Sequence, residues 1–209
     1  MNEFARIPSE RNLVGERLLL REFSHRVNNE FASAIGAISL AAARCSNNEA
    51  KIALAAVQDR LQSYARVHHS LRMPEYSTSI EATAYLRGLC QAISQSKLES
   101  QGIELLLSVY PFRISSERCW LLGLIVSELI TNAARHAFRN GAGSIHLELL
   151  SSESFVECRV TDNGTSDADV RPGTGLGIVE SLARGLNGTI DVQFGPQGAK
   201  SILIFPLDP

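Results

Sequence analysis

The sequence predicts an α+β protein in which a helical hairpin precedes a layer of helices packed on a mixed sheet. Three observations favour this fold class. The chain has an almost purely helical pattern up to about Met73, Pro74 then breaks it because proline cannot continue a helical hydrogen-bond ladder, and from Ser79 helix and strand patterns alternate. We therefore predict two domains, over residues 1–76 and 77–209.

The first half carries two apolar stripes at helical spacing. The polar stretch from Cys45 to Asn48 separates them and predicts the turn, with Asn47 or Asn48 as the N-cap of the second helix. One hairpin buries only part of two such stripes, so we expect two copies to pair as a homodimer in a four-helix bundle. The stripe residues are Leu20, Phe23, Val27, Phe31, Ala34 and Ile38, then Leu54, Val57, Leu61, Tyr64, His68 and Leu71.

The second half alternates between helical and strand patterns. Ser115 or Ser116 is expected to cap its longest helix, and Gly141 lies beyond the end of that helix. The predicted helices span residues 80–98, 115–138 and 177–187, and the predicted strands span 103–109, 144–150, 155–161, 189–194 and 199–205.

Composition excludes several classes of protein. Hydrophobic residues make up 44% of the chain, which allows a buried core, and a formal net charge of −2 gives no reason to expect nucleic-acid or membrane binding. No signal-peptide pattern and no bilayer-length apolar run is present in the sequence. The cysteines form no Cys-x-x-Cys pair, which argues against a zinc site or a disulfide framework. We therefore expect a cytoplasmic protein with no membrane or nucleic-acid partner.

A polar stripe runs along the longest predicted helix. Glu128 and Asn132 are four residues apart, and Arg135 or His136 follows at three or four more, so these side chains share one helix face. The stripe is either a solvated face or a ligand site, and spacing alone favours neither.

A carboxylate and a glycine end the strand Val160-Thr161-Asp162-Asn163-Gly164. A carboxylate at a strand end can accept a hydrogen bond from an exocyclic amine such as that of adenine. The same residues also suit a type I turn with aspartate at a favoured position.

A glycine-rich segment, Pro172-Gly173-Thr174-Gly175-Leu176-Gly177, leads into the next helix. Glycines let the backbone approach a ligand closely, and a helix N-terminus offers free N–H groups to phosphates. No βαβ strand precedes the segment and no Gly-Lys-Ser/Thr follows it, so the Rossmann and Walker A interpretations both fail.

The order and spacing of these three elements resemble the Bergerat, or GHKL, ATP-binding fold over residues 79–207. The resemblance implies that Asn132 coordinates Mg²⁺ bridging the phosphates of ATP, and that Arg135 and His136 lie near those phosphates. It also implies that Asp162 binds the adenine amino group and that Gly164 keeps the base pocket open. Residues 165–172 are then a short lid. The residues expected to close over the phosphates are Gly173, Thr174, Gly175, Leu176 and Gly177.

The first half resembles one branch of that fold's families. The segment from Leu20 to Glu30, which contains Ser24-His25-Arg26-Val27-Asn28-Asn29, is similar to the phosphoacceptor box of HWE/HisKA-type histidine kinases, and Ala65 to Leu71 is similar to the end of their second helix. The resemblance implies a two-component histidine kinase that phosphorylates His25 from ATP and passes the phosphoryl group to an aspartate of a response-regulator receiver domain.

The chain departs from the family pattern at three places. Many histidine kinases have an acidic residue directly after the phosphoacceptor, whereas Arg26 follows His25 here, as is typical of this branch, which leaves Glu22 or Glu128 to orient the imidazole or accept its proton. Ser166 replaces the second glycine of Asp-x-Gly-x-Gly, and Asn28 replaces a lysine.

Two other functions compete with the autokinase. A histidine phosphotransfer hub would keep the bundle and use a non-catalytic ATP-like domain for docking, but it would not need the retained Asn132 and Asp162. An anti-sigma-factor type serine kinase would not need the box around His25. Only about twenty residues precede that box, too few for a PAS or GAF domain, so we expect a truncated chain, a separate sensor protein or a free-standing kinase.

Overall fold

The fold comes from a computed structural model that describes residues 10–71, 79–138, 141–165 and 174–207. The chain forms two compact units, Met1–Arg72 and Met73–Pro209, which we describe separately. The domain division predicted after residue 76 lies outside the described residues.

The first unit is the predicted helical hairpin, made of α1 (Glu10–Arg44) and α2 (Asn48–Ser70). Asn47 caps α2, because its Oδ1 accepts hydrogen bonds from the N–H groups of Glu49 at 2.8 Å and Ala50 at 3.3 Å. The predicted polar turn and one of its two predicted caps are therefore confirmed.

Among the described side chains of the hairpin, the buried one lies near the end of α2. Val67 is 7% exposed. Next to it, the ring of His68 lies 6.0 Å from that of Phe31, and His68 Nδ1 lies 3.2 Å from Asn28 Oδ1 on α1. Farther along the hairpin large apolar side chains remain exposed, namely Leu40, Ile52, Val57 and Tyr64.

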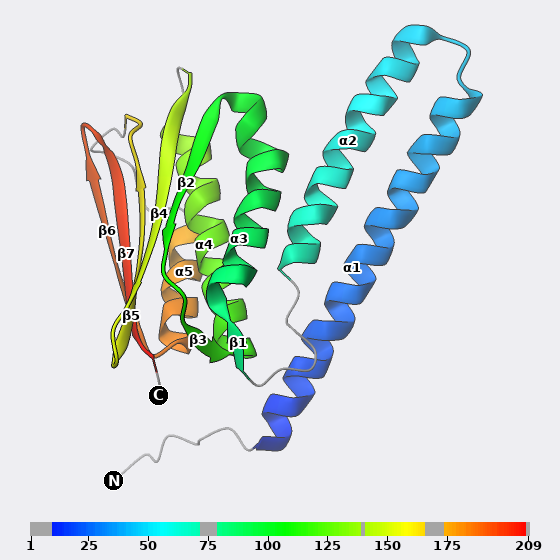
Figure 1. The fold of residues 1–209 in the computed structure, drawn as a ribbon. Helices are drawn as coiled ribbons and strands as arrows, with labels where there is room; N and C mark the ends of the chain where they lie inside the picture. Colours follow the sequence, from blue (N-terminus) through cyan, green and yellow to red (C-terminus); the bar gives the residue numbers. More distant parts are fainter. Residues whose placement is uncertain (1–9, 72–78, 139–140, 166–173, 208–209) are drawn as a thin grey trace. The chain divides into compact units, whose positions relative to one another are not determined.

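The second unit is a five-stranded sheet with helices on one face (Figure 1). The strand order is β2-β4-β5-β7-β6, in which β2 runs parallel to β4 and the other neighbouring pairs are antiparallel. The strands are β2 (Ile103–Val109), β4 (Gly143–Ser151), β5 (Phe155–Asp162), β6 (Thr189–Gly195) and β7 (Gly198–Pro206), and the helices are α3 (Ala82–Ile93), α4 (Ser116–His136) and α5 (Thr174–Gly185).

The core of this unit lies between the sheet and its helices. Alternate residues of β4 and β5 are buried, as expected for strands with one face on a core. Three cysteines, Cys90, Cys119 and Cys158, are fully buried in this layer, whereas Cys45 at the hairpin turn is partly exposed. Burial raises the pKa of the Cys90 and Cys119 thiols to about 12, and it raises the pKa of Cys158 as well.

The start of the second unit differs from the prediction. The single helix expected over residues 80–98 is a short strand, β1 (Ser79–Glu81), followed by α3 and a π-helical turn, η1 (Ser94–Leu98). β1 pairs with another short strand, β3 (Arg113–Ser115), in a separate two-stranded sheet. Ser115 caps α4, since its Oγ accepts a hydrogen bond from the Arg118 N–H at 3.3 Å.

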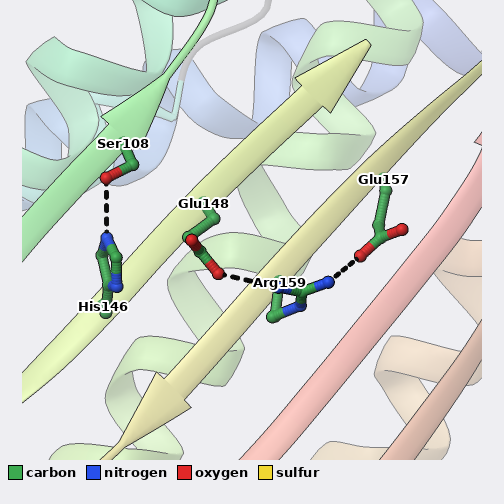
Figure 2. A network of polar contacts seen from close by, with 5 residues as sticks. All are labelled: Ser108, His146, Glu148, Glu157 and Arg159. Carbon is green, nitrogen blue, oxygen red and sulfur yellow. Dashed lines mark hydrogen bonds and ion pairs between the residues drawn. The ribbon is translucent and has the colours of Figure 1, made fainter. Parts of the chain in front are cut away.

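The sheet face opposite the helices carries a network of polar contacts (Figure 2). Arg159 on β5 donates to Glu148 on β4 at 3.0 Å and to Glu157 on its own strand at 2.5 Å. His146 Nε2 lies 2.8 Å from Ser108 Oγ on β2. His146 is thus a half-buried, hydrogen-bonded strand residue on this face.

Within the described residues, no helix has the length and apolar character that crossing a membrane requires.

Candidate functional site

The polar stripe of α4 is present and is only partly solvated. The opposite side of this helix is buried in the core, which fixes the direction in which the stripe points. Glu128 and Asn132 are half-buried, whereas Arg135 and His136 in the last turn are exposed. A half-buried carboxylate and amide on one helix face are therefore available to a ligand.

The first turn of α5 packs directly against this stripe. A Cβ atom built on Gly175 would meet the Glu128 carboxylate and would lie 3.1 Å from Asn132 Nδ2, so a larger residue here would have to push these two side chains aside. The contact brings the N-terminal end of a helix, with its free N–H groups, beside an amide and a carboxylate. Leu176 is half-buried in the same turn, and a Cβ on Gly177 would face open space.

The predicted glycine-rich loop therefore differs in structure from the expectation. The helix begins at Thr174, not at Gly177, so Gly175 and Gly177 belong to its first turn. Gly173 and the expected lid over residues 165–172, apart from Thr165, lie outside the described residues.

Asp162 ends β5 as a buried carboxylate that is 7% exposed. Its Oδ1 accepts hydrogen bonds from the N–H groups of Gly164 at 3.1 Å and Ala199 at 3.2 Å. Burial raises the pKa of this carboxyl, although both backbone hydrogen bonds act to lower it. A buried acceptor of this kind suits a neutral hydrogen-bond donor such as an amine.

Backbone contacts hold the surroundings of Asp162 in place. Gly164 is buried against Ala137 at the end of α4, and the Thr165 N–H donates to the Ala137 carbonyl at 3.1 Å. Gly198 has a φ of +117°, and a Cβ there would collide with the main-chain carbonyl of Asp162.

The sequence prediction missed the part played by Gly198 and Ala199. They had been assigned only to the turn and strand of the last hairpin, and a contact between residues 37 positions apart leaves no pattern along the chain. The signal that the sequence offered was Gly198, a glycine close to the predicted turn of the last hairpin.

The remaining predicted site residues lie on α1. His25 is half-buried, and one turn earlier Glu22 Oε1 accepts from Arg26 Nε at 3.0 Å in an exposed ion pair. Glu22 and His25 belong to the first unit, whereas the other predicted residues belong to the second.

The donor set can be compared with the expected ligands. Among the described residues no group of three or more His, Cys, Asp and Glu side chains could hold a metal ion. For a purine nucleotide, the buried carboxylate, the close glycine contact and the helix N-terminus all fit.

Comparisons with known proteins identify the family that each part of the chain matches. A family model described as histidine kinase matches residues 22–97, and one described as histidine kinase-like ATPase domain matches residues 104–199. The sensor histidine kinase PdtaS of Mycolicibacterium smegmatis is 25% identical over 212 residues, which cover 93% of this chain and 40% of that protein. The chain thus spans about two fifths of the length of this relative.

Two further matches are more restricted. The serine-protein kinase RsbW of Listeria monocytogenes is 50% identical over 46 residues, which are 22% of this chain and 29% of that protein. The histidine kinase domain of the Erythrobacter litoralis EL346 blue-light activated histidine kinase has a TM-score of 0.58 at 19% identity, and the match covers 86% of this chain and 94% of that one. The structural match shows a shared fold.

Proposed function

Because the chain belongs to the histidine kinase family, we propose that it is a protein-histidine kinase that phosphorylates His25 from ATP and passes the phosphoryl group to an aspartate of a response regulator. The observation that carries this proposal is the meeting of Gly175 with Glu128 and Asn132, which sets a helix N-terminus beside a polar stripe. A docking-only domain has no need of that contact.

The second unit would hold the nucleotide. In this proposal Asp162 accepts from the adenine amine, Asn132 contributes its amide oxygen to Mg²⁺, and the N–H groups at the start of α5 face the phosphates. Arg135 and His136 are exposed on the last turn of α4, where Arg135 would supply positive charge and His136 a hydrogen-bond donor near the phosphates. Bound Mg²⁺ would offset the negative charge of the transferred group.

His25 would be the nucleophile. One imidazole nitrogen forms a bond to the γ-phosphorus while the bond between that phosphorus and the bridging oxygen breaks, and ADP leaves with the electron pair. The proton on the imidazole passes to a base. Glu128 is the candidate acceptor, and Glu22, already held by Arg26, would orient the ring.

A homodimer is part of the proposal. Val57 and Ile52 on α2 and Leu40 on α1 are 50%, 64% and 53% exposed in a single hairpin. Burying them against a second copy removes apolar surface from water, as in a four-helix bundle. We also propose a cytoplasmic location, with a response-regulator receiver domain and a separate or attached sensor as partners.

Labelling with γ-labelled ATP and Mg²⁺ tests the proposal. We expect an acid-labile label on the full chain that disappears in His25→Ala. The matched control is His69→Ala, an exposed helical histidine on α2, which should keep the label.

Other results would refute the autokinase. Absence of label from ATP, together with transfer from a phosphorylated receiver domain, would indicate a phosphotransfer hub. An acid-stable label on an added partner protein would indicate a serine kinase.

A further inference from the structure

The π-helical turn η1 changes which side chains of its segment face the core. A hydrogen bond runs from the Glu99 N–H to the Ser94 carbonyl, five residues back. In an uninterrupted α-helix the residue four positions after Ile93 would share its buried face, and that residue is Lys97. In the structure Leu98 is fully buried, whereas Lys97 is only half-buried. The π turn thus keeps a lysine out of the core.

The position of Lys97 is fixed at both its main chain and its side chain. Its carbonyl accepts a hydrogen bond from Gln101 Nε2 at 2.8 Å, and the next residue, Leu98, is anchored in the core. Its ammonium group donates to Thr131 Oγ1 on α4 at 3.2 Å. A lysine held in this way loses much of its side-chain freedom, so the contact sets the place of a positive charge.

Thr131 lies on the flank of the polar stripe of α4. It comes three residues after Glu128 and four before Arg135, so it is their neighbour on the helix surface. The proposed base site, Asp162, precedes a loop that packs on Ala137 at the end of this helix. Six residues separate Ala137 from Thr131, which is about 9 Å along the helix axis. A nucleotide with its base at Asp162 and its phosphates along the stripe would therefore bring its outermost phosphate nearest to Thr131.

We infer that Lys97 binds the terminal phosphate of ATP, with Thr131 as the positioning residue that holds the ammonium group beside the stripe. The inference rests on the proposed function, which assigns a nucleotide site to this unit. Its new content is a cation from outside the predicted motifs, set in place by the π turn, that distinguishes a triphosphate from a diphosphate. Because ADP lacks the outermost phosphate, Lys97 should contribute more to the binding of ATP than to that of ADP.

Lys97→Met tests this inference, because methionine keeps an unbranched apolar side chain and removes the charge. The experiment is calorimetric titration of the full chain with ATP and with ADP, each in the presence of Mg²⁺. We expect the affinity for ATP to fall about tenfold and that for ADP to fall less than about threefold, since loss of a charge-assisted hydrogen bond has roughly the larger effect. Lys97→Arg, which keeps the charge, should recover most of the affinity for ATP.

Two further variants make the test specific. Arg87→Met is the matched control, since Arg87 is exposed on α3 and its replacement removes the same charge from the same unit. It should leave both affinities unchanged. Thr131→Val keeps the lysine and removes the hydroxyl that accepts from it, so we expect a loss of about threefold that is confined to ATP. This variant tests the inference even if Lys97→Met does not fold.

A purely structural role for Lys97 gives a different result. It would lower the affinities for ATP and ADP by the same factor in Lys97→Met, and that outcome would overturn the inference. An unchanged affinity for ATP would also overturn it. Wild-type chain that binds neither nucleotide would refute the proposed nucleotide site itself. If the affinities follow the expected pattern but His25 takes no label from ATP, the inference is supported and the proposed autokinase is refuted.

Discussion

Replacement of Gly175 by alanine should separate nucleotide use from stability. The added methyl group would meet the Glu128 carboxylate and lie 3.1 Å from the Asn132 amide nitrogen. Both atoms end flexible side chains, so we expect them to move aside and the fold to persist. A shift of about 1 Å in a group that positions a substrate can lower activity about a hundredfold, and we expect a loss of that size in labelling from ATP.

Stability should change in the opposite direction. Alanine in place of glycine within a helix stabilises by about 0.5–1 kcal/mol, and the first turn of α5 should show the lower part of that range. For a unit of this size the melting temperature would rise by about 2–4 °C or stay unchanged. Differential scanning calorimetry measures the change in melting temperature. The initial rate of labelling from γ-labelled ATP measures the loss of activity.

Gly88→Ala is the matched control for this prediction. Gly88 is an exposed residue of α3, and a Cβ there would meet no atom within 4 Å. We expect the same methyl group to raise the melting temperature and leave labelling unchanged. If Gly175→Ala labels as fast as Gly88→Ala, to within about threefold, the contact between α5 and the stripe of α4 does not position the nucleotide.

Four further predictions concern pH, packing and association. Burial raises the pKa of Asp162 above its ordinary value of 3.8, so the affinity for ATP should fall as the pH drops through that raised value. Titrations with ATP at several pH values measure this fall, and the affinity of Asp162→Asn should not change over the same pH range. Without nucleotide, the stability contribution of Asp162 is full below pH 3.8 and is lost as the pH rises through its folded pKa, which urea unfolding at two pH values would reveal. Val67→Ala removes two methyl groups from the buried part of the hairpin and should lower its free energy of unfolding by about 1–3 kcal/mol. Urea unfolding measures this change, and an unchanged midpoint of the urea transition would contradict the burial of Val67. Ile52 is 64% exposed in one hairpin, and Ile52→Lys would place a charge in the proposed dimer interface. Light scattering should therefore show a weaker dimer while the helical content stays constant. A fully dimeric variant would contradict the proposed bundle.

Patterns that repeat along the chain were sufficient to predict the helical hairpin and α4. The stripes of three- and four-residue spacing correspond to α1 and α2, and Asn47 and Ser115 cap α2 and α4 as expected. Such features are local, because a cap bonds to the N–H groups two or three residues away.

Features that depend on distant residues were not predicted. β1 and β3 have three residues each, too few to show a period, and their pairing joins residues more than thirty positions apart, such as Ile80 and Ile114. The start of α5 was placed at Gly177, since glycines suggested a loop, but close packing on α4 makes glycine the residue that fits in the first turn.

In the candidate site, too, local features were predicted and contacts between distant residues were not. Asp162 and Asn132 were identifiable because their residue types and order resemble a known motif. The backbone donor of Ala199 was not identifiable, since it depends on how β7 meets β5.

The distribution of cysteines has a practical consequence for spectroscopy. Thiols react as thiolates, so the three core cysteines, with raised pKa values and no exposure, should stay unmodified by a maleimide at neutral pH. Cys45 at the tip of the hairpin would take the label. The wild-type chain therefore offers a single attachment point for a fluorophore or spin label, from which distances between two copies can be measured without engineering any residue.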